Sequence, residues 1–185
     1  MKFPFKDKPL TINSSEITFL QDYSNHAELP VLPHPGAFSK VRKNHIHEGI
    51  DLYCNKHEAV YAMEIGKIVN INYFTGKEID SPWWNTTWCV MVEGESGVIN
   101  YGEIIPDKNI KIGDVVQEGQ LIGKVVPVLK KYKGRPMNML HLELYKQGTK
   151  EHLKEWSLSM DKPDNLLDPT ILLTPFLSLK KSPKI

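Results

Sequence analysis

The chain has 185 residues, of which 41% are hydrophobic and 24% are charged, and its formal net charge is +1. This length and composition are typical of one globular domain with a hydrophobic core of its own. The near-neutral charge argues against a dedicated nucleic-acid-binding protein, which needs a strong basic excess, and no apolar run approaches the roughly 20 residues that span a bilayer.

The N-terminal stretch MKFPFKDKPLTINSSE lacks the continuous apolar segment of a secretory signal peptide. As written, the sequence therefore predicts a cytoplasmic protein, or one that is exported by a non-classical route. In that compartment we expect Cys54 and Cys89 to be reduced and buried, and they could pair only if the fold brings their strands together.

Residues 1–40 are rich in Pro, Ser and Asn, and LPVLPHPGAF places three prolines within six positions. Proline fits neither the interior of a helix nor a central position in a sheet ladder. This composition predicts an irregular N-terminal arm that lies over the rest of the domain.

From residue 49 onward, short runs of β-branched and aromatic residues alternate with Gly, Asn and Asp. In several of them, such as KIVNINY, apolar and polar residues alternate as in a half-buried antiparallel strand. We therefore expect a mainly β fold, a single antiparallel sheet or barrel-like domain over residues 41–148. For residues 149–185 we expect a short helix and a capping tail, with TKEHLKEWSLSM (149–160) as the best helix candidate and DNLLDPTILLTPFL as the cap.

The run NHIHEGIDLY, residues 44–53, contains the first candidate metal ligands. In the extended stretch HEGID, His47 and Asp51 share one face, and Gly49 leaves that face unobstructed. Imidazole and carboxylate groups bind zinc, but a catalytic zinc site needs three protein ligands and an open position. Taken alone, this pair could equally be a polar loop, and His45 offers a rival local site together with His47 and Asp51.

The stretch MNMLHLELY offers a third ligand, because it is typical of a strand with His141 in its middle. Met139 and Glu143 lie on the same face of this strand as His141. An isolated histidine in a strand is more often a core residue with a satisfied hydrogen bond than a metal ligand.

Together, HEGID and the later LHLEL resemble the motifs of the LytM/lysostaphin family of zinc endopeptidases, which cleave peptide cross-links in bacterial peptidoglycan. That family carries H-x-G-x-D and, far downstream, H-x-H in a strand such as HLHFE. AVYAMEIGKIV and GDVVQEGQLIG are similar to further family segments, so the resemblance covers roughly residues 42–146 in order. It implies a LytM-type antiparallel fold and one zinc ion per chain, bound by His47, Asp51 and His141.

The sequence departs from the family pattern at both histidines that assist the zinc-bound water. Met139 stands where the first histidine of H-x-H is expected, and Glu103 in NYGEI stands at the position of the second. Glu103 could act as the general base, could fill the fourth metal position, or could orient a ligand from outside the metal shell. It could also be an ordinary exposed strand residue; we favour the general base.

Several further residues are candidates for a substrate groove. The insert FTGKEIDSPWWNTTWC places Trp83 and Trp84 where they could form an aromatic wall or close one end of the core. Arg135 could bind a substrate carboxylate, although a surface position is commoner for arginine. We expect His45 to line the groove or the surface, and Glu143 to lie in the outer shell of the metal.

These residues support two main hypotheses. The first is a zinc-dependent metalloendopeptidase that hydrolyses peptidoglycan-type or Gly-rich peptides with a zinc-bound water. The second is a catalytically degenerate metal-binding module for recognition or regulation on the same scaffold, and a signalling domain that has lost hydrolysis is a weaker third. We expect a monomer whose partner is a peptide or a peptidoglycan fragment, with no nucleic acid and no membrane span.

Overall fold

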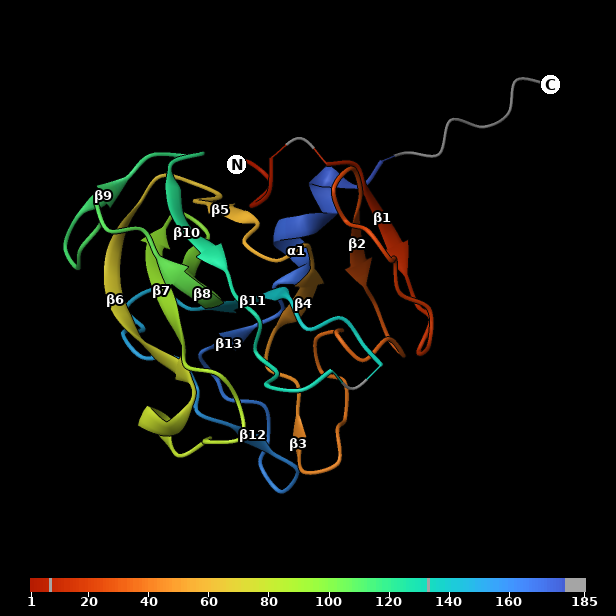
Figure 1. The fold of residues 1–185 in the computed structure, drawn as a ribbon. Coiled ribbons are helices and arrows are strands. Elements are labelled where there is room, and N and C mark those ends of the chain that lie inside the picture. Colours follow the sequence, from red (N-terminus) through yellow and green to blue (C-terminus); the bar gives the residue numbers. More distant parts are fainter. Residues whose placement is uncertain (7, 133, 179–185) are drawn as a thin grey trace.

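The computed structural model describes residues 1–6, 8–132 and 134–178 and is mainly β (Figure 1). Nine strands form one antiparallel sheet with the order β13-β11-β8-β7-β6-β9, in which β4 also pairs with β11, and β10 pairs with β8 and β5. Within the described residues β13 and β9 do not pair, so the sheet is open rather than a closed barrel. The nine strands are β4 (Ile50–Tyr53), β5 (Ala59–Tyr61), β6 (Gly66–Thr75), β7 (Thr87–Gly94), β8 (Gly97–Pro106), β9 (Val115–Val116), β10 (Leu121–Val125), β11 (Met139–Tyr145) and β13 (Leu166–Leu167).

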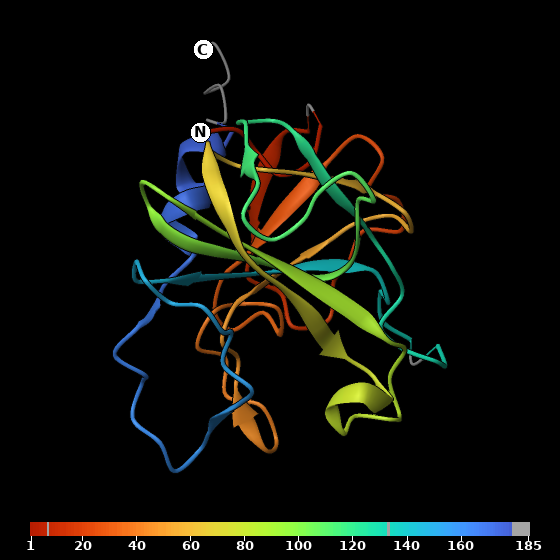
Figure 2. The same ribbon diagram turned by 90° about the vertical axis from the view of Figure 1, so that its left-hand side faces the viewer.

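The predicted mainly antiparallel β fold is therefore confirmed. Its centre is formed by β6, β7 and β8, which are long, strongly twisted strands (Figure 2). The first eight residues of β8 are all buried, which explains why this strand reads as GVINYGEI with few charges. One large apolar cluster, which includes Ile68, Val90, Tyr101 and Leu142, fills the interior.

The two strands that hold the candidate ligands each separate an apolar face from a polar face. In β11, Leu140, Leu142 and Leu144 belong to the main apolar cluster, and so do Ile50 and Leu52 in β4. Because neighbouring side chains of a strand point to opposite faces, the residues between these positions all face away from that cluster. The apolar face thus fixes the register that places the polar residues.

The remaining elements lie outside the nine-stranded sheet. In residues 1–40, β1 (Leu10–Asn13) and β2 (Ala27–Pro30) form a parallel pair, and the other described residues of this segment are turns and irregular backbone. Two short strands, β3 (His45–Ile46) and β12 (Trp156–Ser157), pair with each other. The helical elements are η1 (Lys77–Ile79), α1 (Thr170–Leu173) and η2 (Thr174–Phe176). The division into segments 1–40, 41–148 and 149–185 stays a prediction, and residues 179–185 lie outside the described chain.

The expectation of a helix at 149–160 was wrong, and the short C-terminal helix is α1 instead. Two backbone amides of this segment bind to side chains outside it: Leu153 N–H donates to the Tyr145 hydroxyl in β11 (2.8 Å), and Trp156 N–H donates to Glu48 Oε1 just before β4 (2.8 Å). The Trp156 side chain is also buried. These tertiary contacts outweigh the helical propensity of the segment.

Cys54 and Cys89 are free and buried, as expected for reduced thiols. Among the helices of the described chain, none has both the length and the apolar character needed to cross a membrane.

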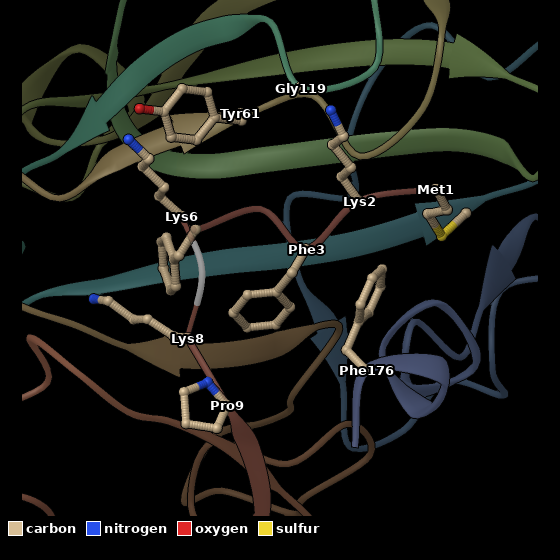
Figure 3. A pocket seen from close by; sticks show the side chains of 10 residues that line it. Met1, Lys2, Phe3, Lys6, Lys8, Pro9, Tyr61, Gly119 and Phe176 are labelled. Carbon is tan, nitrogen blue, oxygen red and sulfur yellow. The ribbon is translucent and has the colours of Figure 1, made fainter. Parts of the chain in front are cut away.

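A cleft of about 660 Å³ lies between residues of the N-terminal segment (1–3, 5, 6, 8 and 9), β5 and η2 (Figure 3). Phe3 and Phe176 pack against each other in it at 5.6 Å, while the Lys6 side chain extends towards Tyr61. None of the candidate metal ligands lines this cleft.

Candidate metal centre

His47 and Asp51 meet the distant His141 on the polar face of β4 and β11. Asp51 lies directly opposite His141 in the antiparallel ladder, and His47 lies in the bend that leads into β4. Asp51 Oδ1 is 3.1 Å from His47 Nε2 and 2.9 Å from His141 Nδ1, and the two nitrogens are 3.3 Å apart. Within the described residues, this is the one cluster of His, Cys, Asp or Glu with the spacing of metal ligands.

The donor set and its spacing fit a zinc ion. Tetrahedral zinc with bonds of about 2.0–2.1 Å places neighbouring ligand atoms about 3.3 Å apart, close to the separations of 2.9–3.3 Å found here. Two imidazoles and one carboxylate are also a set that catalytic zinc sites use. All three side chains are buried, so the protein holds them in place before any ion binds.

Outer hydrogen bonds orient both imidazoles for metal binding. His47 Nδ1 lies 2.9 Å from the carbonyl oxygen of Ala37, which only accepts, so Nδ1 carries the proton and Nε2 keeps its lone pair. His141 Nε2 lies 3.2 Å from Glu143 Oε1, and Glu143 Oε2 accepts from Asn100 Nδ2 (2.6 Å) and the Tyr145 hydroxyl (3.0 Å). A proton on His141 Nε2 leaves Nδ1 free to ligate. Glu143 thus contacts His141 on the side away from the cluster, and its role beside a metal stays a prediction.

The charges of the site favour a cation at the three ligand atoms. Burial opposes ionisation of Asp51, but the charges of His47 and Arg42 hold its pKa well below the usual range. Burial also opposes protonation of His141, yet its hydrogen bonds to Asp51 and Glu143 raise its pKa well above the usual value. A ring between two carboxylates thus stabilises positive charge, whether from a proton or from a metal ion.

The segment just before the first motif supports the cluster from outside. Arg42 Nη2 donates to Asp51 Oδ2 (2.7 Å) and to the carbonyl oxygen of Pro35 (2.9 Å), which leaves Asp51 Oδ1 for the imidazoles. The Asp51 amide donates to the carbonyl oxygen of Gly36 (2.9 Å), and the His47 amide donates to that of Lys40 (3.0 Å). Residues 35–42 are therefore part of the site.

Glu103 combines three unfavourable features next to this cluster. It follows Gly102, which pairs with His141, at a β-bulge where β8 has two residues opposite one residue of β7. Its φ is +64°, a left-handed conformation that non-glycine residues rarely adopt. Its side chain is buried, and Oε2 has no hydrogen-bond partner among the described residues. Burial and then the charge of Asp51 raise the pKa of Glu103 to about 8. It is not an exposed strand residue.

The other residues that the sequence suggested for the site lie outside the cluster of His47, Asp51 and His141. His45 is half-buried in β3 and pairs with Ser157, and Met139 is half-buried at the start of β11, opposite Tyr53. Arg135 is exposed. Trp83 is 63% exposed and makes an edge contact with the half-buried Trp84, so this pair does not close the core.

Sequence reasoning missed Arg42 and Asn100. Arg42 lies five residues before His47, so its charge near the motif was a usable signal. Asn100 carried no such signal, since its role follows from the pairing of β8 with β11.

Comparison with known proteins gives a consistent picture. The family model of peptidase family M23 matches residues 45–152. Among solved structures, the catalytic domain of lysostaphin from Staphylococcus simulans has a TM-score of 0.50 and 20% identity, over 75% of this chain and 89% of that one. CbpA from L. salivarius REN has a TM-score of 0.43 and 20% identity, over 71% of this chain and 76% of that one. Csd3 from Helicobacter pylori has a TM-score of 0.43 and 16% identity, over 80% of this chain and 38% of that one. No curated protein matches the chain significantly.

Gly49 provides a test of how tightly the ligand strands pack. A Cβ atom there would lie 2.6 Å from the carbonyl oxygen of Leu142 and 2.7 Å from His141 Nε2, both closer than real contacts allow. We expect Gly49→Ala to lower the free energy of unfolding by roughly 1–3 kcal/mol, as overpacking does, and the melting temperature by several degrees. Thermal unfolding followed by circular dichroism measures this, and an unchanged melting temperature would contradict the packing described here.

Proposed function

Because the chain belongs to peptidase family M23, we propose that it is a zinc-dependent metalloendopeptidase that hydrolyses peptidoglycan-type or Gly-rich peptides. The observation that carries this proposal is the cluster of His47 Nε2, Asp51 Oδ1 and His141 Nδ1 within 3.3 Å of one another. A bound zinc ion would act as a Lewis acid on the scissile carbonyl and would acidify water. Three protein ligands leave one coordination position for the reaction.

We assign the general-base role to Glu103. Its carboxyl group is buried beside the ligand cluster and has one oxygen without a partner, which is free to accept a proton from attacking water. The water oxygen bonds to the carbonyl carbon while Glu103 takes the proton. The peptide C–N bond then breaks, and the same proton passes to the leaving nitrogen. Burial and the charge of Asp51 raise the pKa of Glu103 to about 8, and a cation held by His47, Asp51 and His141 would lower it and so favour the carboxylate form at neutral pH.

One observation favours a second candidate, a binding module without hydrolysis. Met139 occupies the position of an assisting histidine, and its thioether can neither donate nor accept a proton at neutral pH. Such a module would keep the metal and bind a peptide without cutting it.

We predict one zinc ion per chain in protein purified without a histidine tag. His141→Ala and Asp51→Ala should each lose most of the metal, because each removes a ligand from a three-ligand set. His45→Ala is the matched control, since this histidine is two residues from His47 but its ring is not in the cluster. Elemental analysis measures zinc per chain. Equal zinc in all four proteins would rule out the site, and loss in His45→Ala alone would point to the rival local site.

We predict that Glu103→Gln keeps zinc but loses activity. The amide retains the shape of the side chain and removes only the base, so hydrolysis of a peptidoglycan-type peptide should fall by roughly 10²–10⁴-fold, the usual contribution of a positioned base.

Activity assays and elemental analysis on the same preparations separate the outcomes. Loss of zinc in Glu103→Gln would show instead that Glu103 is a ligand. Wild-type protein that holds zinc but cleaves no peptide, and that gains no activity from Glu103→His combined with Met139→His, would exclude the peptidase and leave the binding module.

A further inference from the structure

We propose that the hydroxyl group of Tyr53 is a second catalytic group of this site, which donates a hydrogen bond to the oxygen of the scissile carbonyl. The inference rests on the proposed hydrolytic function. It concerns the step in which that oxygen becomes negative, and it supplies a donor that neither Met139 nor Glu103 in its carboxylate form can provide.

The strand register places Tyr53 in the row of site residues. In β4, Tyr53 lies two positions after Asp51 and therefore on the same face. In the antiparallel ladder with β11, Asp51 is opposite His141 and Tyr53 is opposite Met139. Side chains directly opposite each other are about 4.5–5.5 Å apart at Cβ, so Tyr53 is the cross-strand neighbour of the position where the assisting imidazole is missing.

The ring of Tyr53 is held firmly by residues from the N-terminal segment. It makes an edge contact with Phe19 at 5.2 Å and a tilted contact with His34 at 5.8 Å. A Cβ atom on Gly36 would lie 3.2 Å from Tyr53 Cε2 and 3.1 Å from Asp51 Cβ, so the backbone at Gly36 packs against both residues. A ring fixed in this way loses little entropy when its hydroxyl binds a substrate.

The hydroxyl itself is uncommitted in the described residues. The Tyr53 hydroxyl forms no hydrogen bond there, and its oxygen is not fully enclosed by protein atoms. The residue as a whole is 8% exposed. The hydroxyl therefore retains limited access to solvent from a mostly buried ring. A phenol is neutral at physiological pH and so keeps the proton that it would donate.

The surrounding charges suit a donor of this kind. Asp51 and Tyr53 lie on the same face of β4, and Arg42 donates a hydrogen bond to Asp51. Arg42, the other strong donor in this group, already binds Asp51 Oδ2 and the Pro35 carbonyl oxygen. Tyr53 is thus the donor of this group that remains for a substrate oxygen.

In the step concerned, water adds to the carbonyl carbon, Glu103 takes one water proton, and the carbonyl π electrons move to oxygen. Tyr53 shares its proton with that oxygen by a hydrogen bond and does not transfer it. When the C–N bond breaks, the electron pair returns from oxygen to re-form the carbonyl, and the proton held by Glu103 goes to the leaving nitrogen. The hydrogen bond strengthens as the charge develops, so it acts mainly on kcat.

The test compares Tyr53→Phe with wild type, with Tyr73→Phe as the matched control. Phenylalanine at position 53 keeps the ring contacts with Phe19 and His34. The control residue Tyr73 is 38% exposed, and its ring makes a tilted contact with Trp88. We expect kcat of Tyr53→Phe on a peptidoglycan-type peptide to fall by about 10²-fold, as when one oxyanion donor is removed, with little change in KM. Zinc content and melting temperature should match wild type.

A second measurement does not depend on turnover. A peptide phosphinate has a tetrahedral centre with negatively charged oxygens, so its affinity for Tyr53→Phe should fall by a similar factor, while the affinity for the product peptide stays unchanged. Calorimetry measures both. If the wild type is active and kcat of Tyr53→Phe lies within twofold of the wild-type value, this inference alone is overturned. Loss of zinc from Tyr53→Phe would also overturn this inference alone. Zinc-loaded wild type without hydrolysis would overturn the proposed function and this inference together.

Discussion

The antiparallel pairing of β4 with β11 is the constraint on which the site depends. It sets Asp51 against His141 across a sequence separation of 90 residues, and it does so because Ile50, Leu52, Leu140 and Leu142 lie on the opposite face in the main apolar cluster. A shift of one residue would turn every polar side chain of β11 into the core. The burial of the leucines and isoleucine thus stabilises the register, and the register gives the ligand geometry.

A second layer of contacts fixes the direction of each ligand atom. The Ala37 carbonyl and the Glu143 carboxylate select the imidazole nitrogens that face inward, and Arg42 selects the oxygen of Asp51. Part of this layer comes from residues 35–42, which precede the span matched by the family model. Glu103 contributes in the opposite sense: a left-handed backbone and an unpartnered buried carboxyl oxygen typically cost about 1–3 kcal/mol each. Stability alone does not account for such a residue, and the general-base role that we propose for Glu103 would.

Much of this could be predicted from the sequence, for identifiable reasons. Alternation of apolar and polar residues predicted the antiparallel strands. The resemblance of HEGID and LHLEL to the motifs of the LytM/lysostaphin family implied which three side chains meet, whereas each motif alone left a polar loop or a core histidine open. The helix at 149–160 was wrong because the Tyr145 hydroxyl and Glu48, which lies 108 residues from Trp156, bind its amides. The role of Asn100 was out of reach for the same reason. Glu103 was found as a departure from a family motif, but its φ and its burial depend on the bulge between β7 and β8.

The central claim is that three protein side chains bind one metal ion and that Glu103 stays outside the metal shell as a base. A crystal structure of the zinc-loaded protein, with the ion located by anomalous scattering at the zinc edge, tests this most directly. We expect zinc bound by His47 Nε2, Asp51 Oδ1 and His141 Nδ1, with a non-protein ligand in the fourth position and Glu103 unbound. Zinc with Glu103 as its fourth protein ligand, or zinc bound elsewhere on the chain, would contradict it.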